Sequence, residues 1–166
     1  RGLDGPLAIR YPRGRGEIVH WKMPFTELPM GKSRQLRKGR RIAVLTLGTL
    51  GPRVKRVLDR LGGTEFTHID MRYMKPLDEE CLKEVFQQHD LVVTLEDGVL
   101  RGGFGSAIME FASENEFQKP VKRIGIGDEF IGHGSVEELE RMTGLDESSI
   151  EQEFEHLLSN LKSGSK

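Results

Sequence analysis

The stretch IAVLTLGTLGP, residues 42–52, decides the fold of this 166-residue chain. Residues 42–47 are all apolar except Thr46, a pattern that is typical of a strand covered on both faces. Gly48 then punctuates the strand, and Pro52 is suited to the first turn of a helix. A strand that passes directly into a helix is half of a βαβ unit, so this stretch favours a parallel sheet.

The same alternation continues on both sides of residues 42–52. Asp78 is the expected N-cap of one helix, and Ser135 with Glu138 forms an expected capping box for another. We expect strands at Lys32–Arg37, Ile42–Leu47, Phe66–Met71, Leu91–Leu95 and Val121–Ile126, and helices after Pro52, at Leu77–Gln88, at Ala107–Ser113, from Ser135 to Gly144 and after Asp146.

This order of elements predicts an α/β fold with a mostly parallel sheet and helices on both faces. The strands at 32–37 and 42–47 are joined by a short turn at Lys38-Gly39, so we expect this pair to supply one antiparallel edge strand. A further short strand near residues 7–11 ends at Pro12, which cannot donate to a ladder. We therefore expect an opening strand segment at 1–14, a linker at 15–30, the α/β domain at 31–162 and a disordered tail at 163–166.

Composition and charge exclude several classes of protein. The chain is 36% hydrophobic and 31% charged, and no apolar run approaches the ~20 residues of a membrane span. There is no secretory signal, and the single Cys81 excludes a disulfide framework and a cysteine-rich zinc site. These features predict a cytoplasmic protein without a membrane partner. Because the chain begins at Arg1 and reaches a strand almost at once, we expect a fragment of something larger.

The charge is unevenly distributed along the chain. Residues 1–60 carry fifteen Lys/Arg against four Asp/Glu, and the remainder carries ten against twenty-two. Such asymmetry can mark a nucleic-acid-binding protein. The basic half, however, has no zinc ligands, no aromatic RNA-binding motif and no helix-turn-helix pattern, so we expect no nucleic-acid partner.

Two arginines stand close to the end of the opening strand, in the stretch AIRYPRG at residues 8–14. A guanidinium group can grip a phosphate or carboxylate at two points, which makes Arg10 and Arg13 candidate substrate-binding residues. Side chains alternate across a strand, so the two arginines would face opposite sides if the chain stayed extended. At most one of them is expected to reach a given site, and the alternative is that both are solvated charges at the end of the strand.

Other candidate residues carry weaker patterns. Gly102-Gly103-Phe104-Gly105 lies at a strand-to-helix turn, which suits either an anion or close helix–sheet packing. Glu96 and Asp97 are adjacent on a strand and face opposite sides, so we do not expect an acid–base pair. No histidine has metal-ligand spacing, and His133, in a glycine-flanked loop, is expected to make structural hydrogen bonds. We therefore predict no catalytic, cofactor-binding or metal-binding residue.

Read in order, six motifs resemble one family. They are AIRYPRG at 8–14, MRYMKPLD at 71–78, HDLVVTLED at 89–97, GGFGS at 102–106, IGIGDEFIGHGS at 124–135 and GLD at 144–146. Together they resemble the C-terminal portion of the 1-deoxy-D-xylulose-5-phosphate synthases, thiamine-diphosphate enzymes of the transketolase superfamily. The family commonly has Glu-Glu-Asn where this chain has Glu96-Asp97-Gly98.

The resemblance implies a function for the longer protein. The family condenses pyruvate with glyceraldehyde 3-phosphate and releases carbon dioxide, which feeds isoprenoid and thiamine synthesis, and it works as a homodimer with thiamine diphosphate and magnesium. It implies that residues 1–14 are the last strand of the pyrimidine-binding domain and that residues 31–162 are the transketolase C-terminal-like domain. Arg13 resembles the arginine that grips the substrate phosphate, with Arg10 assisting or pointing elsewhere.

The resemblance also implies what this piece lacks. The cofactor-binding signature and the activating glutamate would lie before Arg1, so we expect the fragment to bind no cofactor and to be inactive alone. Its partners would be the remaining domains of the same enzyme. Two alternatives stay open: the C-terminal domain of a transketolase or of a 2-oxoacid dehydrogenase E1 β subunit, and a stand-alone domain that binds an anionic partner.

Overall fold

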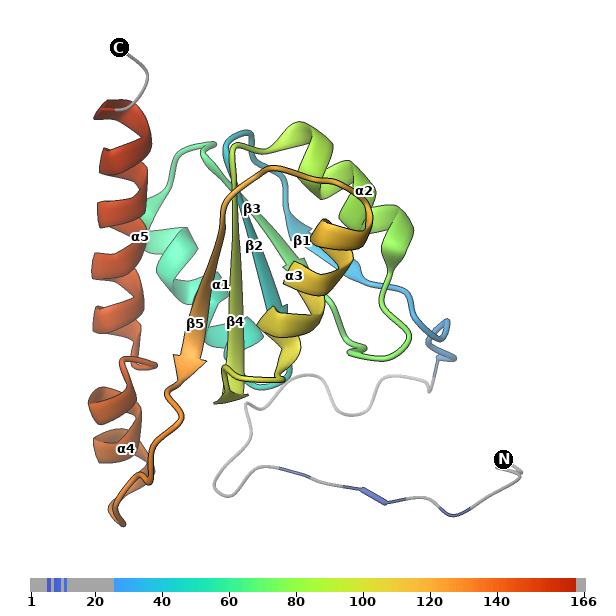
Figure 1. Cartoon of the computed structure of the whole chain (residues 1–166). Coiled ribbons are helices and arrows are strands. Elements are labelled where there is room, and N and C mark those ends of the chain that lie inside the picture. The colour runs from blue at the N-terminus through green and yellow to red at the C-terminus, as the bar shows by residue number, and fades with distance from the viewer. Residues whose placement is uncertain (1–5, 7, 10, 12–25, 164–166) are drawn as a thin grey trace.

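A computed structural model of the chain describes residues 6, 8, 9, 11 and 26–163. Strands and helices alternate along the described part. The strands are β1 (Arg34–Arg37), β2 (Ile42–Leu47), β3 (Phe66–Asp70), β4 (Leu91–Val99) and β5 (Val121–Ile126); the helices are α1 (Leu50–Leu61), α2 (Glu79–Gln88), α3 (Phe104–Glu114), α4 (Val136–Thr143) and α5 (Glu147–Ser163). The strands form one sheet in the order β1-β3-β2-β4-β5 (Figure 1).

The sheet is parallel except at one edge, as the sequence predicts. β2 pairs in parallel with β3 and β4, and β4 pairs in parallel with β5. β1 is antiparallel, but it pairs with β3 and not with β2. The expected hairpin at Lys38-Gly39 is therefore wrong. Gly39 instead lies against the backbone of Phe66 and donates from its amide to Thr67 Oγ1 at 3.0 Å, so the connection crosses the start of β3.

The apolar run in β2 contributes to a core on each face of the sheet. On one face, Ile42 and Val44 pack with residues of α1 and α5, including Val54 and Phe154. On the other face, Ala43 and Leu45 belong to a cluster with buried residues of α2 and α3. Helices thus cover both faces of the sheet (Figure 1), and residues 42–46 of β2 are buried completely, with only Leu47 at its end partly exposed.

Helix ends are fixed by the residues that the sequence singles out, and by one that it does not. Asp78 caps α2, the Ser135–Glu138 capping box begins α4, and Gly144 ends α4 at φ 69°. In addition, Arg37 of β1 donates to the Leu58 carbonyl at the end of α1, at 2.8 Å. A cation at this position satisfies free carbonyls and interacts favourably with the helix dipole.

Element boundaries differ most from the expected ones at α3 and β4. α3 begins at Phe104, three residues before the expected Ala107, and β4 continues to Val99, beyond the expected Leu95. The pairing of β4 with β5 shifts register between Leu95 and Val99, so the glycine-containing end of β4 is irregular. Of the expected opening strand, Ala8, Ile9 and Tyr11 are described, and none of these three lies in a strand.

Candidate functional site

The two candidate substrate-binding residues, Arg10 and Arg13, lie outside the described residues. Most of the expected linker, residues 15–25, does so too, as do residues 164–166 of the expected tail. Their roles and the domain boundaries stay predictions. The described candidates lie around the carboxyl ends of the parallel strands, where open α/β sheets place their ligands.

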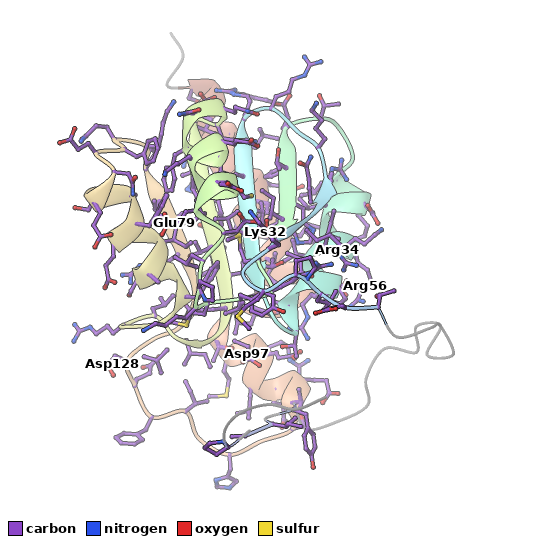
Figure 2. The ribbon with its side chains drawn as sticks, turned by 90° about the vertical axis from the view of Figure 1, so that its right-hand side faces the viewer. Lys32, Arg34, Arg56, Glu79, Asp97 and Asp128 are labelled. Carbon is purple, nitrogen blue, oxygen red and sulfur yellow. The ribbon has the colours of Figure 1, made fainter. Side chains whose placement is uncertain are left out.

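A crevice opens where the strand order reverses, between the carboxyl ends of β2 and β4. Its volume is about 450 Å³, and Tyr11 of the upstream segment contributes to its lining. Leu47-Gly48-Thr49 line it from β2, and Glu96-Asp97-Gly98 line it from β4. Asp97 and Asp128 mark this edge of the molecule in Figure 2.

Glu96 fills the anion-binding position in this crevice. Its side chain is buried, with Oε2 accepting from the Phe104 amide at 2.7 Å and Oε1 accepting from the Gly105 amide at 2.9 Å. These are the free amides at the first turn of α3, which a helix offers to an anion. The chain therefore supplies its own carboxylate where a ligand phosphate would otherwise bind.

The glycines of the motif allow this arrangement. A Cβ on Gly103 would overlap the Glu96 carboxylate and the Val99 carbonyl. A Cβ on Gly105 would meet Thr94 Oγ1 at 2.6 Å and Arg123 Cδ at 2.8 Å. Of the two sequence interpretations of this motif, close packing of α3 on the sheet is therefore the one that the structure supports.

The neighbouring acidic residue has a different environment. Asp97 is exposed and accepts a weak hydrogen bond from Thr49 at 3.4 Å, whereas Glu96 points into the protein. The alternation along β4 separates the two carboxylates, so they do not act on one proton.

His133 does not make the structural hydrogen bonds that we expected. It is exposed in the loop between β5 and α4, and no hydrogen bond from a described residue reaches its ring. The structural histidines are His68 and His89, which lie in the core and hydrogen-bond to Thr46 at 3.0 Å and Thr67 at 2.7 Å. His68 is the middle residue of β3 and His89 lies two residues before β4, so their position in and beside predicted strands is the sequence signal that could have identified them.

His68 is the most perturbed titratable group in this core. Burial, and to a lesser extent the positive charge of Lys55, lower its pKa to about 4. Its Nδ1 has no hydrogen-bond partner among the described residues. The side chain is buried and its Nε2 lies 3.0 Å from Thr46 Oγ1, so we assign it a structural role.

Asp78 anchors the segment that leads into β1. Its carboxylate accepts from the Ser33 amide at 2.8 Å and the Ser33 hydroxyl at 2.9 Å, as well as from the Cys81 amide. Burial raises the pKa of Asp78, but the hydrogen bonds from Ser33 and Cys81 and the charge of Lys32 outweigh this and hold it below its usual value. Cys81 is partly buried beside it, and burial raises the pKa of its thiol.

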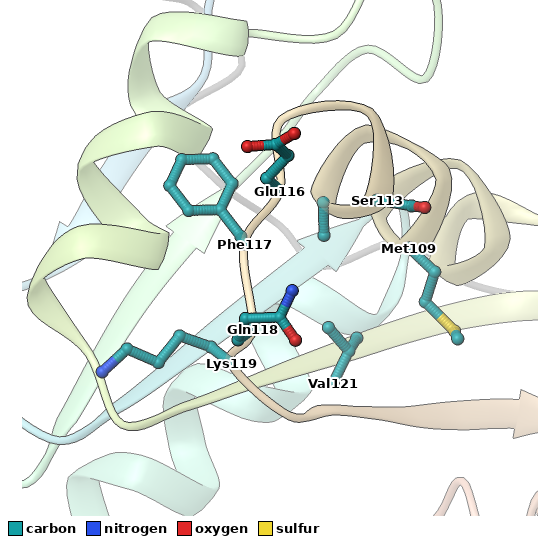
Figure 3. A pocket seen from close by; sticks show the side chains of 8 residues that line it. Met109, Ser113, Glu116, Phe117, Gln118, Lys119 and Val121 are labelled. Atoms are coloured by element: carbon teal, nitrogen blue, oxygen red, sulfur yellow. The ribbon is translucent and has the colours of Figure 1, made fainter.

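A larger cavity, about 640 Å³, lies away from this edge, near the end of α3 and the start of β5 (Figure 3). Its charged lining residues, Glu116 and Lys119, point in different directions (Figure 3). Phe117, on its inner side, stacks on Phe86 with ring centroids 5.0 Å apart. No group is placed here for acid–base or nucleophilic chemistry, so the crevice at the carboxyl edge is the better candidate site.

The described residues do not form a metal site. Within residues 26–163 and the four described upstream positions, no group of three or more His, Cys, Asp or Glu is arranged to hold a metal ion. No helix in the described part is long and apolar enough to cross a membrane.

Comparison with known proteins identifies the fold and the family. The family profile of the transketolase C-terminal domain matches residues 31–150. A solved structure described as a split gene transketolase, inactive beta4 tetramer, superposes with a TM-score of 0.70 at 29% identity, covering 76% of this chain and 42% of that one.

Curated relatives carry a more specific name. The 1-deoxy-D-xylulose-5-phosphate synthase of Phocaeicola vulgatus is 48% identical over 149 residues, 88% of this chain and 24% of the relative. The synthase of Bacteroides thetaiotaomicron is 46% identical over 153 residues, 90% of this chain and 24% of the relative. The chain thus spans about a quarter of the length of these relatives, and it resembles their C-terminal portion. It belongs to the transketolase C-terminal domain family.

Proposed function

We propose that the chain is the C-terminal part of a 1-deoxy-D-xylulose-5-phosphate synthase. In this proposal the whole enzyme condenses pyruvate with glyceraldehyde 3-phosphate and releases carbon dioxide. The observation that carries the proposal is the similarity to relatives of that name, at 46–48% identity over about nine-tenths of the chain. The whole enzyme is a cytoplasmic homodimer.

Residues 26–163 contribute architecture and not chemistry to this enzyme. The anion-binding position at the start of α3 is taken by Glu96, and among the described residues no nucleophile lies beside a base. The piece alone therefore has no synthase activity.

Thiamine diphosphate and magnesium belong to the remainder of the enzyme. A diphosphate with its metal needs a cluster of oxygen ligands and free amides. The described residues do not fit this requirement, because they form no metal-ligand cluster and the buried amides at the first turn of α3 already donate to Glu96. No step of the reaction is therefore assigned to residues 26–163.

Arg13 is the residue of this chain that reaches substrate. We assign it to the phosphate of glyceraldehyde 3-phosphate, because a guanidinium group forms two charge-assisted hydrogen bonds with a phosphate. Arg10, three residues earlier on an extended segment, points to the other side or assists.

Kinetics of the full-length enzyme test this proposal. Loss of a charge-assisted contact of about 1.5–3 kcal/mol predicts that Arg13→Ala raises the KM for glyceraldehyde 3-phosphate roughly 10–150-fold. The KM for pyruvate stays nearly unchanged, and Arg15→Ala, a control in the glycine-flanked stretch, changes neither value. Equal losses for both substrates contradict the role of Arg13, and turnover by the 166-residue chain contradicts its inactivity.

A transketolase is the second candidate, favoured by the solved structure of that description. The two candidates differ in their donor substrate, because the synthase releases carbon dioxide from pyruvate. A full-length enzyme that transfers ketol groups between sugar phosphates and ignores pyruvate would select the transketolase.

A further inference from the structure

Helix α4 and the loop before it contribute little to the packing that holds the rest of the domain together. None of the residues of α4 is buried, and of residues 128–142 only Ile131, Leu139 and Glu140 are half-buried. α1 packs along α5, whereas no described helix or strand packs extensively against α4. Figure 1 shows α4 beyond the end of the sheet, connected to β5 by a loop. We call residues 128–143 the α4 flap.

Gly144 gives the α4 flap a hinge. It ends α4 in the left-handed region, at φ 69°, and a Cβ at this position would meet no atom within 4 Å. Directly after it, Leu145 is buried in the core cluster that α1 and α5 share. At its other end the flap is an exposed loop that contains Gly132 and Gly134. Glycine changes its backbone angles more readily than any other residue, so Gly144 is the point at which the flap can turn.

One arginine of α1 spans this hinge. Arg53 donates from Nη2 to Glu140 Oε1 in the flap and from Nη1 to the Leu145 carbonyl on the other side of Gly144, both at 2.5 Å. The side chains of Arg53 and Glu140 are 19% and 27% exposed, so the pair is partly withdrawn from water. A guanidinium group that donates from two of its nitrogens fixes geometry as well as charge. Arg53 therefore holds the two sides of Gly144 in one arrangement.

The other contacts show why this pair matters for α4 and would matter less for α5. Among the described residues, Arg101–Asp128 is the other ion pair that joins the flap to the rest of the chain, and both of its side chains are exposed. Exposed ion pairs contribute little to stability. α5 also has an ion pair with α1, between Glu151 and Arg60, but its Phe154 is buried in the core. Loss of an ion pair should therefore leave α5 in place and release α4.

We propose that the α4 flap opens as a unit about Gly144 while the core stays folded, and that the Arg53–Glu140 pair holds it closed. A segment with few buried apolar contacts opens at a smaller free-energy cost than the whole domain. Opening displaces the exposed side chains of Phe130 and Met142 relative to the sheet. Because salt screens ion pairs, the closed arrangement becomes less favoured as ionic strength rises. The pair thus makes the shape of this end of the domain dependent on ionic strength.

Hydrogen–deuterium exchange of the 166-residue chain, followed by mass spectrometry, tests the proposal. In the unvaried protein, the amides of α4 should exchange faster than those of β2 and α1. Glu140→Gln removes the charge and keeps the size of the side chain, and it should accelerate exchange in α4 at least about threefold without changing β2, α1 or α5. Glu151→Gln, the matched control on α5, should leave α4 unchanged. Raising NaCl from about 0.05 M to about 0.5 M should accelerate exchange in α4 of the unvaried protein more than in Glu140→Gln.

Each of the opposite results overturns the proposal. Equal protection of α4 and the core in the unvaried protein means that the flap does not open separately. Acceleration of β2, α1 and α5 to the same extent as α4 in Glu140→Gln means that the whole domain has lost stability. Unchanged exchange of α4 in Glu140→Gln, an equal effect of Glu151→Gln on α4, or an equal effect of salt with and without the Glu140 charge means that this pair does not hold the flap. Circular dichroism of both variants checks that they fold.

Discussion

Replacing Glu96 tests whether this side chain closes the anion-binding position at α3. In Glu96→Ala, the buried amides of Phe104 and Gly105 lose acceptors at 2.7 and 2.9 Å. Each charge-assisted hydrogen bond contributes about 1.5–3 kcal/mol, so the variant should lose roughly 3–6 kcal/mol of unfolding free energy. For a domain of this size, that corresponds to a decrease of roughly 6–24 °C in Tm.

The neighbouring carboxylate provides the control. Asp97→Ala removes an exposed group with one weak contact to Thr49, and it should cost less than about 1 kcal/mol. Both variants are measured by thermal and urea unfolding. Acetate, which imitates the missing carboxylate, should raise the Tm of Glu96→Ala more than that of the unvaried protein at equal ionic strength. Equal losses for the two variants, or no specific effect of acetate, would refute the reasoning.

Three further predictions concern the core and the helix ends. Gly105→Ala should lower stability by about 1–3 kcal/mol, because the added methyl group overlaps side chains that are fixed in the sheet; denaturant unfolding measures this loss. Asp78→Ala should lower the free energy of unfolding by roughly 2–4 kcal/mol, because the N-cap of α2 and the hydrogen bonds from Ser33 are lost. Since the pKa of Asp78 is lowered in the folded state, the difference in stability between the variant and the unvaried protein should shrink as pH falls below about 4. His68 has a pKa of about 4 in the folded state against 6.5 in the unfolded state, so the unfolded state binds a proton first as pH falls. The free energy of unfolding should therefore decrease by roughly 2–4 kcal/mol between pH 6.5 and pH 4. Urea unfolding at each pH should show a smaller decrease for His68→Gln.

The sequence was sufficient for the elements whose pattern is local. The apolar run at Ile42–Leu47 predicts a strand covered on both faces, and Asp78, Ser135 and Gly144 predict helix ends, because each signal depends on residues a few positions apart. All of these are confirmed. The family resemblance, carried by six ordered motifs, is confirmed as well.

The features that the sequence did not predict depend on contacts between residues that are distant along the chain. The pairing of β1 with β3 follows from the passage of Gly39 over the start of β3, which no local pattern encodes. Glu96 caps α3 because the chain turns back after the irregular end of β4, which brings the Phe104 amide, eight residues later, to the Glu96 carboxylate. In retrospect, the glycines before α3 were the available signal, since they indicate that another group approaches the backbone closely.

The resemblance, and not the spacing of residues, gave the function. At the candidate site around α3, the Glu96 carboxylate is hydrogen-bonded within the protein. Arg10 and Arg13, on which the substrate prediction rests, lie outside the described residues. What the structure adds is the exposure of Phe130 and Met142, which depends on where α4 and its preceding loop lie.

Hydrogen–deuterium exchange of residues 127–143 tests the central claim most directly, namely that this chain is the C-terminal part of a larger enzyme and packs against the remainder of it. The 166-residue chain and the full-length protein are compared under identical conditions. The account predicts slower exchange in the full-length protein at the loop carrying Phe130 and at α4, with no change in the middle of α3 around Met109. Equal exchange at residues 127–143 in the two proteins would contradict it.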